Sequence, residues 1–525
     1  MLIGDISRRN ARRHPNKPAV IYEGKVQTWG ELDERANRLG TYLQSKGLVK
    51  GDRVAIAARN IGHWPEITYG LAKAGMVLVP LNARISGPEA AYMVADSGAR
   101  AAIVFDEQVE LFGPVVKDLH VVLGIETDAL GVNYESALAE GRNEDPTPAD
   151  LTPDDLHFLL YTSGTTGRPK GVMNVHRAMI MQAFDTNLAT EGVAEDIMLA
   201  STPFYTAGGM LRTVSWLFLG QTIVIHPRFD AERVIADIEK HRVTMTTFIP
   251  TMLQRLLKLA EDEPGHDFSS LRRISYGSAP SADWLARKAS DLLGCELQQR
   301  YGLTEAGGQV TILTPADHQL MMTTKPWLVS SCGKETAQAE ISICDDDGNE
   351  LPAGEVGEIV IKCESMASGY WNLPEVTAKT FRSDGRLFSG DVGKLDEDGY
   401  LYIVSRKTDM IISGGFNVYP AEIERVLGMH PNVDLVAVIG KPDREWGETP
   451  VAVIVPKGDI TTEALEEALR TLSRSDLAGY KQPRIYEFRD ELPLGPAGKI
   501  LKRQLRDEIS ATASTTAPAA ATKGA

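Results

Sequence analysis

The residues best suited to chemistry lie in one short loop, Tyr161-Thr162-Ser163-Gly164-Thr165-Thr166-Gly167-Arg168-Pro169-Lys170-Gly171. Backbone N–H groups of such a glycine-rich, hydroxyl-rich loop can surround phosphate oxygens, while the lysine adds a positive charge. An apolar run, Phe158-Leu159-Leu160, precedes the loop and places it at the end of a strand. It is not a Walker A motif, which ends in Gly-Lys followed by Ser or Thr. Here Pro169 precedes Lys170, and Gly171 follows it. A glycine-rich loop of this composition can also be a plain surface turn. The succession Ser-Gly, Thr-Thr, Gly and Pro-Lys-Gly makes this loop more specific and predicts a phosphate site.

Two further motifs carry groups that suit a nucleotide. In Tyr301-Gly302-Leu303-Thr304-Glu305 the aromatic ring can stack on a purine, and the carboxylate can bind Mg²⁺, which favours oxygen ligands. In Ser389-Gly390-Asp391-Val392-Gly393 a carboxylate at a turn can accept from both hydroxyls of a ribose. Each motif taken alone is more simply a core tyrosine with a solvated glutamate, or an ordinary aspartate turn.

The last two motifs lie near the C-terminus. Ser405-Arg406-Lys407-Thr408-Asp409 precedes Ser413-Gly414-Gly415-Phe416-Asn417-Val418, and a charged segment before a Gly-Gly turn is typical of a linker that can bend. Pro496-Ala497-Gly498-Lys499-Ile500 presents a lysine on a loop before the helical pattern of residues 501–505. A single loop lysine is ordinarily just solvated.

Taken together and in this order, the five motifs resemble those of the acyl-adenylate-forming enzymes, which include acyl-CoA synthetases, luciferases and peptide-synthetase adenylation domains. The resemblance runs from about Ser7 to Arg506, and its most specific parts are residues 162–170 and 410–424. Residues 411–424, together with Lys441-Pro442-Asp443 and Trp446-Gly447-Glu448, are most similar to the CoA ligases.

The resemblance implies an ATP-dependent carboxylic acid–CoA ligase. Such an enzyme converts an acid and ATP to acyl-AMP and pyrophosphate, and then passes the acyl group to CoA with release of AMP. It implies ATP and Mg²⁺ at the site and CoA as co-substrate. Lys499 would bridge the carboxylate and the α-phosphate, on a small C-terminal domain that swings between the two steps.

The resemblance also assigns residues to sites. The catalytic residues would be Lys499, Thr304 and Glu305, with Glu305 also the metal ligand. The ATP site would contain Thr162, Ser163, Gly164, Thr165, Thr166, Gly167, Lys170, Gly277, Ala279, Pro280, Tyr301, Asp391 and Arg406. The CoA site would contain Gly414, Gly415, Trp446, Tyr480, Lys481 and Arg484. The acid pocket would contain Phe204, Tyr205, Thr206, Phe248, Met252, Gly302, Gly307, Gly308 and Gln309.

These pocket candidates are mostly apolar or small and include no fixed cation for a second carboxylate. They favour a fatty or aromatic monocarboxylic acid. Three single positions and one segment depart from the family pattern. Thr206 stands where a histidine is common, Ser405 where a glycine is usual, and Thr408 where the hinge has Asp or Lys. Residues 494–497 replace the commoner Arg-Thr-Pro-Thr.

The departures at Thr206 and Thr408 keep an alternative open. An adenylating enzyme could pass its acyl group to an amine or to a carrier-protein thiol. A non-catalytic nucleotide sensor is a further alternative, against which Lys499 and Glu305 speak. A luciferase-like oxygenase would carry the same motifs.

The elements that must position these motifs alternate between strands and helices in the first half. Thr28 and Glu31 form a capping-box pattern before a helix, and residues 54–57, 101–105 and 222–225 form short apolar runs typical of buried strands. The pattern predicts an α/β fold with parallel sheets in a large N-terminal domain. We expect the domain at 1–404 with a β subdomain at about 333–404, a hinge at 405–409, a mobile α+β C-terminal domain at 410–509 and a disordered tail at 510–525.

The composition excludes some classes of protein. With 55 Lys and Arg against 71 Asp and Glu, the net charge of −16 argues against general nucleic-acid binding. The four cysteines form no CxxC pair, and we interpret them as thiols in a reducing cytosol. The longest apolar stretch, residues 207–226, is interrupted by Arg212 and Gly220, which predicts a soluble, cytoplasmic protein without a membrane span. Peripheral membrane association and the oligomeric state stay open.

Overall fold

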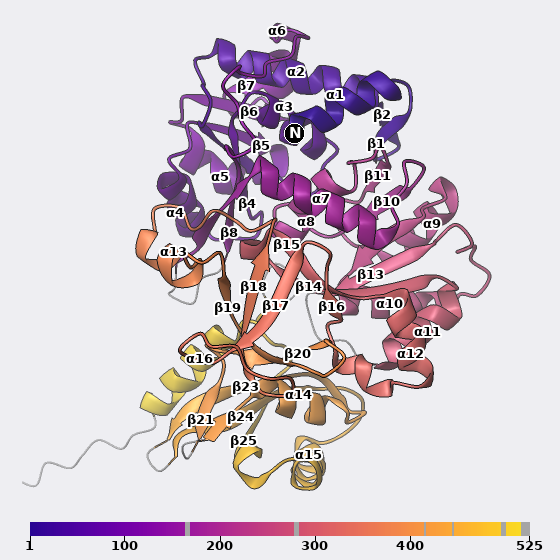
Figure 1. Cartoon of the computed structure of the whole chain (residues 1–525), viewed down its shortest axis with the longest axis vertical. Coiled ribbons are helices and arrows are strands. Elements are labelled where there is room, and N and C mark those ends of the chain that lie inside the picture. Colours follow the sequence, from indigo (N-terminus) through magenta and orange to yellow (C-terminus); the bar gives the residue numbers. More distant parts are fainter. Residues whose placement is uncertain (163–167, 278–282, 414–415, 444–445, 495–499, 516–525) are drawn as a thin grey trace, which may run out of the picture. The chain divides into compact units, whose positions relative to one another are not determined.

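The computed structural model describes residues 1–162, 168–277, 283–413, 416–443, 446–494 and 500–515. The chain has a mixed α/β fold with a large N-terminal and a small C-terminal domain, as expected (Figure 1). Contacts divide it into two units. The larger consists of Met1–Ser342, Val360–Ser389 and Asp396–Tyr402, and the smaller of Ile343–Ile359, Gly390–Leu395 and Ile403–Ala525. Two segments of the expected β subdomain, Ile343–Ile359 and Gly390–Leu395, thus group with the C-terminal part. We did not predict this grouping, because the order of residues along the chain does not reveal which strand ends pair.

The larger unit contains a seven-stranded sheet in the order β7-β6-β5-β3-β4-β8-β9. Its strands are β3 (Arg53–Ala57), β4 (Val77–Leu81), β5 (Ala101–Phe105), β6 (Val121–Ile125), β7 (Val132–Asn133), β8 (Leu156–Thr162) and β9 (Lys170–Val175). The first six strands pair in parallel, and only β9 runs antiparallel to its neighbour. Strands β3 to β6 are almost entirely buried, as continuous apolar runs in a covered parallel sheet should be.

A nine-stranded sheet has the order β16-β15-β14-β13-β12-β10-β11-β1-β2. Its strands are β1 (Pro18–Tyr22), β2 (Lys25–Thr28), β10 (Ile197–Ala200), β11 (Thr222–Ile225), β12 (Met245–Phe248), β13 (Arg273–Gly277), β14 (Glu296–Leu303), β15 (Gly308–Leu313) and β16 (Lys334–Glu335). The central pairs are parallel, whereas β14 and β15 form an antiparallel pair joined by a tight turn. This turn carries part of the second sequence motif.

Helices cover both sheets. They are α1 (Gly4–Arg13), α2 (Trp29–Ser45), α3 (Trp64–Lys73), α4 (Gly87–Ser97), α5 (Val109–Val116), α6 (Tyr134–Glu140), α7 (His176–Thr190), α8 (Ala207–Ser215), α9 (Ala231–His241), α10 (Pro250–Asp262), α11 (Asp283–Leu293), α12 (Pro315–Thr323) and α13 (Pro374–Thr380). The predicted capping box at Thr28 is present: its side chain accepts from Glu31 N, and the Glu31 carboxylate accepts from Thr28 N. Buried Trp29, Leu32, Leu39 and Leu43 of α2 contribute to the main apolar core.

A four-stranded sheet, in the order β17-β18-β19-β20, contributes residues to both units. Its strands are β17 (Ala339–Cys344), β18 (Gly357–Cys363), β19 (Leu387–Leu395) and β20 (Leu401–Arg406). The third sequence motif, around Asp391, lies within β19.

The C-terminal part of the smaller unit is an α+β fold with its own core. Its sheet contains β21 (Ile411–Ser413), β22 (Phe416–Val418), β23 (Val433–Asp443), β24 (Gly447–Pro456) and β25 (Ile485–Phe488). Helices α14 (Pro420–Gly428) and α15 (Thr462–Asp476) pack on it through Ile423, Leu427 and Leu465. Helix α16 (Lys502–Thr515) runs into the stretch expected to be disordered, where alanine favours helix.

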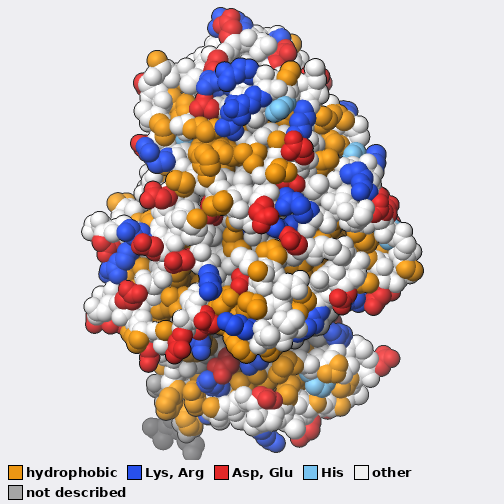
Figure 2. Space-filling view, turned by 45° about the vertical axis from the view of Figure 1, so that its right-hand side comes forward, with side chains coloured by type: hydrophobic (Ala, Val, Ile, Leu, Met, Phe, Trp, Pro, Cys, Tyr) orange, Lys and Arg blue, Asp and Glu red, His pale blue; other side chains and the backbone are white. Residues whose placement is uncertain are grey.

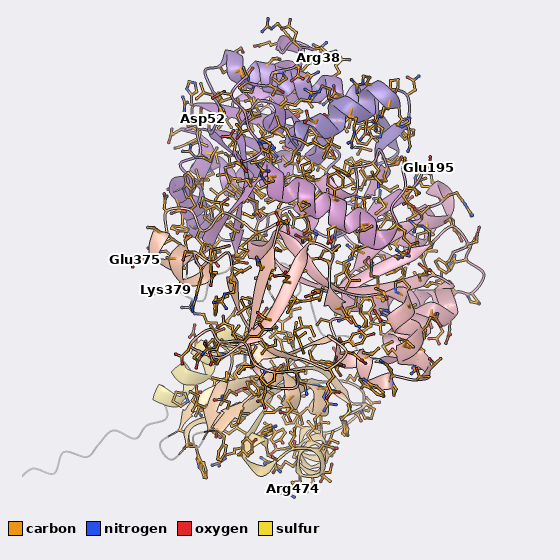
Figure 3. All side chains as sticks on the ribbon, in the orientation of Figure 1. Arg38, Asp52, Glu195, Glu375, Lys379 and Arg474 are labelled. Atoms are coloured by element: carbon orange, nitrogen blue, oxygen red, sulfur yellow. The ribbon has the colours of Figure 1, made fainter. Side chains whose placement is uncertain are left out.

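Many charged side chains lie on the outside of the molecule, whereas Glu66, Lys73 and Asp391 are buried. Figure 3 shows Arg38 and Glu195 pointing away from the ribbon of the larger unit. On the face shown in Figure 2, acidic and basic side chains are intermixed. Among the described residues, no helix is long and apolar enough to cross a membrane.

Candidate active site

The loop at Thr162–Lys170 closes a hairpin between two strands. Thr162 at the end of β8 lies opposite Lys170 at the start of β9, and the intervening residues 163–167 lie outside the described residues. The base of the hairpin is fixed to α4: the Tyr161 hydroxyl donates to Asp96 Oδ2 at 2.7 Å, and the Arg168 guanidinium lies 5.3 Å from the centre of the Tyr92 ring. The predicted phosphate loop therefore begins and ends on ordered strands.

Tyr370 connects the loop to the second motif, and we did not anticipate it from the sequence. Its hydroxyl donates to Glu305 Oε1 at 2.9 Å, and Lys170 Nζ lies 4.6 Å from the centre of its ring. Burial, followed by the charge of Glu305, raises the pKa of Tyr370, so the hydroxyl stays a donor. Tyr370, which bridges to Val172 of β9, brings together Lys170 and Glu305, which are 135 positions apart in sequence.

Glu305 is held in a short 3₁₀ helix, Thr304–Ala306, between β14 and β15. Its carbonyl accepts from Ala367 N at 2.9 Å, and Gly307 N donates to Thr304 O at 3.1 Å. Gly307 has φ +73°, and a Cβ added there would lie 2.0 Å from Ser365 O. Only glycine fits this position, so the turn that carries Thr304 and Glu305 is sterically defined.

Two of the remaining adenine-site candidates lie near the start of this turn. Tyr301 lies near the end of β14, and Gly277 ends the neighbouring strand β13 opposite Arg300. A Cβ at Gly277 would lie 2.5 Å from Arg300 O, so the two strands approach closely there. Ala279 and Pro280 lie outside the described residues.

The ribose candidate Asp391 belongs to the smaller unit. It is buried, and its Oδ1 lies 3.1 Å from Arg406 Nε. The neighbouring backbone is fixed because Lys407 N donates to Gly390 O at 2.8 Å, and Gly390 N donates to Glu358 Oε1 at 3.0 Å. The structure thus pairs two residues that the sequence motifs named separately.

Several acid-pocket candidates have structural contacts. Phe204 and Phe248 are fully buried in two different apolar clusters. Thr206 caps α8: its hydroxyl accepts from Gly209 N at 3.3 Å and donates to Pro203 O at 2.8 Å. The hydroxyl at the position where the family often has histidine is therefore engaged in capping.

The glycine candidates are positions of close backbone approach. A Cβ at Gly302 would lie 2.0 Å from Gly308 O, and one at Gly308 would lie 2.8 Å from Gln182 Cδ. Gln309 donates from Nε2 to Asp185 Oδ2 at 3.0 Å. These residues bring β14, β15 and α7 together, and the space beside each missing side chain is occupied. Met252 lies on α10, partly buried against the cluster that contains Phe248.

The predicted CoA residues form two aromatic contacts on the smaller unit. The Arg484 guanidinium lies 4.2 Å from the centre of the Trp446 ring, and Tyr480 stacks on Phe416 with ring centres 4.8 Å apart. Lys481 Nζ is paired with Glu422 at 2.7 Å. Phe416, which follows Gly414-Gly415 directly in sequence, was not singled out from the sequence, although an aromatic residue next to that glycine pair was the available signal. Gly414, Gly415 and Lys499 lie outside the described residues.

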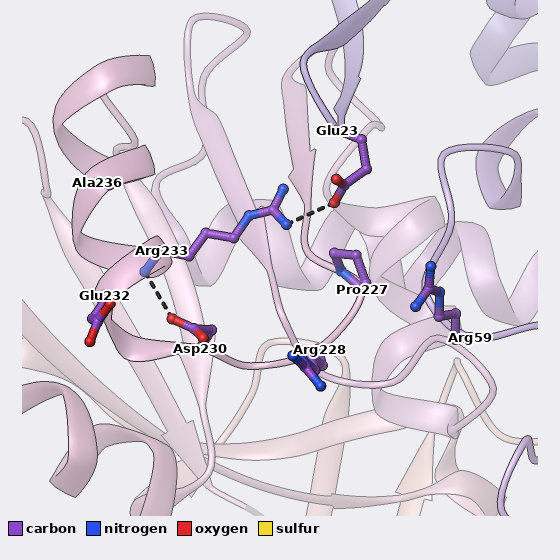
Figure 4. A pocket seen from close by; sticks show the side chains of 8 residues that line it. All are labelled: Glu23, Arg59, Pro227, Arg228, Asp230, Glu232, Arg233 and Ala236. Atoms are coloured by element: carbon purple, nitrogen blue, oxygen red, sulfur yellow. Dashed lines mark hydrogen bonds and ion pairs between the residues drawn. The ribbon is translucent and has the colours of Figure 1, made fainter.

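A separate surface cavity of about 630 Å³ lies elsewhere in the larger unit. Figure 4 shows that Arg233 is turned toward Glu23, while Arg59 and Arg228 line the opposite side. Three arginines and three acidic residues line it, so its fixed charges balance, and it contains none of the residues that the motifs predict. The described residues also include no group of three His, Cys, Asp or Glu side chains that could hold a metal ion.

Comparisons with known proteins define the class. The family model described as AMP-binding enzyme matches residues 7–371, and that described as AMP-binding enzyme C-terminal domain matches residues 422–499. The chain therefore belongs to the AMP-binding, acyl-adenylate-forming enzyme family and is an adenylate-forming ligase, as its motifs predicted.

Individual relatives match nearly the whole chain. It is 38% identical to the fatty acid–[acyl-carrier-protein] ligase ScoC of Streptomyces coeruleorubidus, covering 95% of both chains. It is 36% identical to the feruloyl-CoA synthase of an Amycolatopsis species, covering 95% of this chain and 97% of the relative. Among solved structures, the amide bond synthetase McbA of Marinactinospora thermotolerans matches 97% of this chain and 100% of its own with a TM-score of 0.86 at 28% identity.

Proposed function

We propose that the protein is an ATP-dependent carboxylic acid–CoA ligase. It would join an acid to AMP with release of pyrophosphate, and then transfer the acyl group to the thiol of CoA with release of AMP. The observation that carries this proposal is the cluster in which Tyr370 links the Glu305 carboxylate to Lys170 at the base of the phosphate loop. Family membership and the similarity to a feruloyl-CoA synthase support it.

The nucleotide would bind across these motifs. The loop at 162–170 would hold the β- and γ-phosphates through backbone N–H groups and Lys170. Tyr301 would stack on adenine beside Gly277, Ala279 and Pro280, and Asp391 would accept from the ribose hydroxyls with Arg406 beside it. Because Asp391 already pairs with Arg406, ribose binding would share that carboxylate.

Glu305 suits a magnesium ion bound together with ATP. Its carboxylate is a hard oxygen ligand oriented by Tyr370, and Mg²⁺ in nucleotide sites usually takes one or two carboxylates plus phosphate oxygens. When bound, the ion would neutralise phosphate charge. Thr304 would donate to a phosphate oxygen from the same turn.

Adenylation brings together two anions, the carboxylate and ATP. Lys499 would offset their repulsion and stabilise the charge that develops at the α-phosphate. Holding the carboxylate oxygen in line with the phosphorus would lower the barrier further by removing the entropy cost of alignment. Both effects depend on protein groups that are in position before the reaction begins.

CoA is the proposed acyl acceptor, and the aromatic contacts on the smaller unit would take part in its recognition. The Trp446–Arg484 and Phe416–Tyr480 pairs offer flat faces for an adenine ring, and Arg484 and Lys481 offer positive charge for its phosphates. Gly414 and Gly415 would line the path of the thiol.

An amine or a carrier-protein thiol is the second candidate for the acceptor. Similarity to a fatty acid–[acyl-carrier-protein] ligase and to an amide bond synthetase favours this alternative specifically. The acid itself is proposed to be a fatty or aromatic monocarboxylic acid. The described cysteines form no disulfide, which fits the reducing cytoplasm that we propose as the site of the reaction.

The test is a panel of fatty and aromatic acids incubated with ATP and Mg²⁺, with and without CoA. We expect pyrophosphate release in both cases and a CoA thioester, detected by mass spectrometry, only when CoA is added. Pyrophosphate release without any CoA thioester would indicate that an amine or a carrier-protein thiol, and not CoA, is the acceptor. No pyrophosphate from any acid would contradict adenylation itself.

A further inference from the structure

Two arginines of the larger unit form no ion pair with a carboxylate among the described residues. On α8, Arg212 donates from Nη1 to the Thr202 hydroxyl, and its guanidinium lies 5.4 Å from the centre of the Trp216 ring. On β14, Arg300 donates from Nη2 to Gln298 Oε1 at 2.9 Å, while its buried Nε has no hydrogen-bond partner. Both arginines are partly buried. Guanidinium groups that lose much of their hydration ordinarily pair with an oxyanion, so a nearby acceptor would stabilise both.

The two guanidinium groups belong to one neighbourhood. Helix α8 packs against β15, which is the antiparallel partner of β14, and α7 packs against both α8 and β15 (Figure 1). Burial lowers the pKa of Arg212 to about 10 and, together with the positive charge of Arg212, lowers that of Arg300 to about 9. Each group thus experiences an environment that disfavours its charge, which a bound acceptor would relieve.

One carboxylate lies in this neighbourhood, and it does not neutralise both arginines. Asp185 on α7 attracts Arg300 but forms no ion pair with it among the described residues. Its Oδ2 accepts from Gln309 instead, and burial raises its pKa. Two cations facing at most one carboxylate leave a net positive charge.

Both arginines border the predicted acid pocket. Arg212 follows the Thr206 cap on the same helix, and a Cβ at the exposed Gly208 would lie 3.7 Å from Arg212 Nη2. Arg300 stands two residues before Gly302 and opposite Gly277, which has no side chain to cover it. The guanidinium groups therefore lie beside the two segments that the sequence assigned to the acid.

We propose that the acid carries a second oxygen acceptor, remote from the reacting carboxylate, and that Arg212 and Arg300 bind this oxygen. The inference rests on the proposed ligase function and revises its substrate class, because Arg212 and Arg300 are cations that would also admit an acid with a second carboxylate beside the monocarboxylic acids proposed above. The acceptor is the oxygen of a hydroxyl, an ether or a second carboxylate. A pure hydrocarbon tail would leave the two guanidinium groups with only the neutral acceptors Thr202 and Gln298, and their remaining N–H groups would lack partners in a site from which water is displaced.

The test compares matched acids by pyrophosphate release: hexanoic, 6-hydroxyhexanoic and adipic acids, and cinnamic, 4-methoxycinnamic and 4-carboxycinnamic acids. We expect the wild-type kcat/KM to favour the best oxygenated member of a series by about 10- to 100-fold over its hydrocarbon member. Arg212→Met should reduce this preference to within about threefold, because it removes the charged donor, while activity on the hydrocarbon acid persists.

Arg9→Met is the matched control. Arg9 is also partly buried, donates to Phe218 O and lies 5.0 Å from the centre of the Phe218 ring, without a carboxylate partner among the described residues. It should leave the preference unchanged. Should Arg212→Met fail to fold, Arg212→Lys and Arg300→Gln, each checked by thermal unfolding, test the same point.

The outcomes distinguish a neutral from an anionic oxygen acceptor. They also distinguish failure of this inference from failure of the proposed function. Preference for a hydroxyl or methoxy acid identifies a neutral oxygen, and preference for a dicarboxylic acid identifies an anion; either supports the inference. The inference would be overturned if the wild-type kcat/KM were as high for the hydrocarbon acids as for the oxygenated acids. It would also be overturned if the preference for oxygenated acids persisted in both arginine variants. Adenylation would stand in either case. No pyrophosphate from any acid would overturn the proposed function and this inference together.

Discussion

Two regions proposed to bind substrates are built in different ways. At the base of the phosphate loop, Glu305, Tyr370 and Lys170 are held by backbone pairing and by a hydrogen bond to a charged group. On the smaller unit, Phe416 and Tyr480 are 58% and 38% exposed and contact mainly each other. The first region is organised before any substrate binds, whereas the second presents aromatic surface that is free to make contact. This suits chemistry in one region and the capture of a ligand in the other.

Removing the charge of Glu305 should have the largest effect. Glu305→Gln keeps the shape of the side chain but loses the anion proposed to bind Mg²⁺, so we expect kcat for pyrophosphate release to fall by about 100- to 1,000-fold. Glu375→Gln, at an exposed position on α13, is the control and should retain activity. Near-normal kcat in Glu305→Gln would remove the charge-based role assigned to the first region.

The next effect comes from backbone geometry. Gly307→Ala places a Cβ 2.0 Å from Ser365 O at φ +73°, so it should displace the Glu305 turn, lower Tm by several degrees and slow adenylation by less than Glu305→Gln does. In the smaller unit, Gly479 has no heavy atom within 4 Å of the added Cβ, so Gly479→Ala should change the free energy of unfolding by less than about 1 kcal/mol. Equal thermal shifts in the two variants would erase the contrast between the regions.

Tyr370→Phe sharpens the comparison within the first region. It deletes the hydrogen bond to Glu305 and keeps the ring beneath Lys170, so we expect kcat to fall about tenfold, the size of one hydrogen bond to a charged group. The apparent Mg²⁺ requirement should rise as well, because Glu305 loses its orienting donor. A titration of Mg²⁺ at saturating ATP measures this. An unchanged Mg²⁺ requirement would assign Tyr370 to packing alone.

The smallest effect is expected on the second region. Trp446→Ala removes the ring over which Arg484 lies, so KM for CoA should rise about fivefold while pyrophosphate release without CoA stays unchanged. Trp327→Ala, at an exposed tryptophan of the larger unit, is the control. A fall in the adenylation rate of Trp446→Ala would mean that this face does not act in the acceptor step alone.

Much of the fold could be predicted from local patterns. The capping-box pattern of Thr28 and Glu31 predicted the start of α2. The apolar runs at 54–57, 101–105 and 222–225 predicted strands β3, β5 and β11. These signals depend on neighbours a few residues away, so the sequence contains all the information needed. The family followed from motifs whose order and spacing are themselves sequence properties, and the comparisons confirm it.

The contacts around the candidate site were beyond such reasoning. The Glu305, Asp391 and Lys170 motifs were visible, but Tyr370 was not singled out, because nothing in its surroundings along the chain marks a tyrosine as the donor to Glu305. The sequence did not decide whether the candidate pocket glycines leave room for a substrate. In the structure, the space beside Gly302 is occupied by Gly308 O, and the space beside Gly308 by the Gln182 side chain. An absent side chain in the sequence does not reveal which group occupies its place.

The amino-acid order by itself determined the element types, the adenylate-forming family and the groups that could meet ATP, because these depend on residue chemistry and short spacings. Only the tertiary structure decided which distant groups meet: Lys170 with Glu305 through Tyr370, and Asp391 with Arg406. It also places Arg212 near enough to lower the pKa of Arg300. The physical reason is that the strengths of charge and hydrogen-bond interactions depend on distance in space and on burial. Both quantities arise only when sheets and helices far apart in the chain pack together.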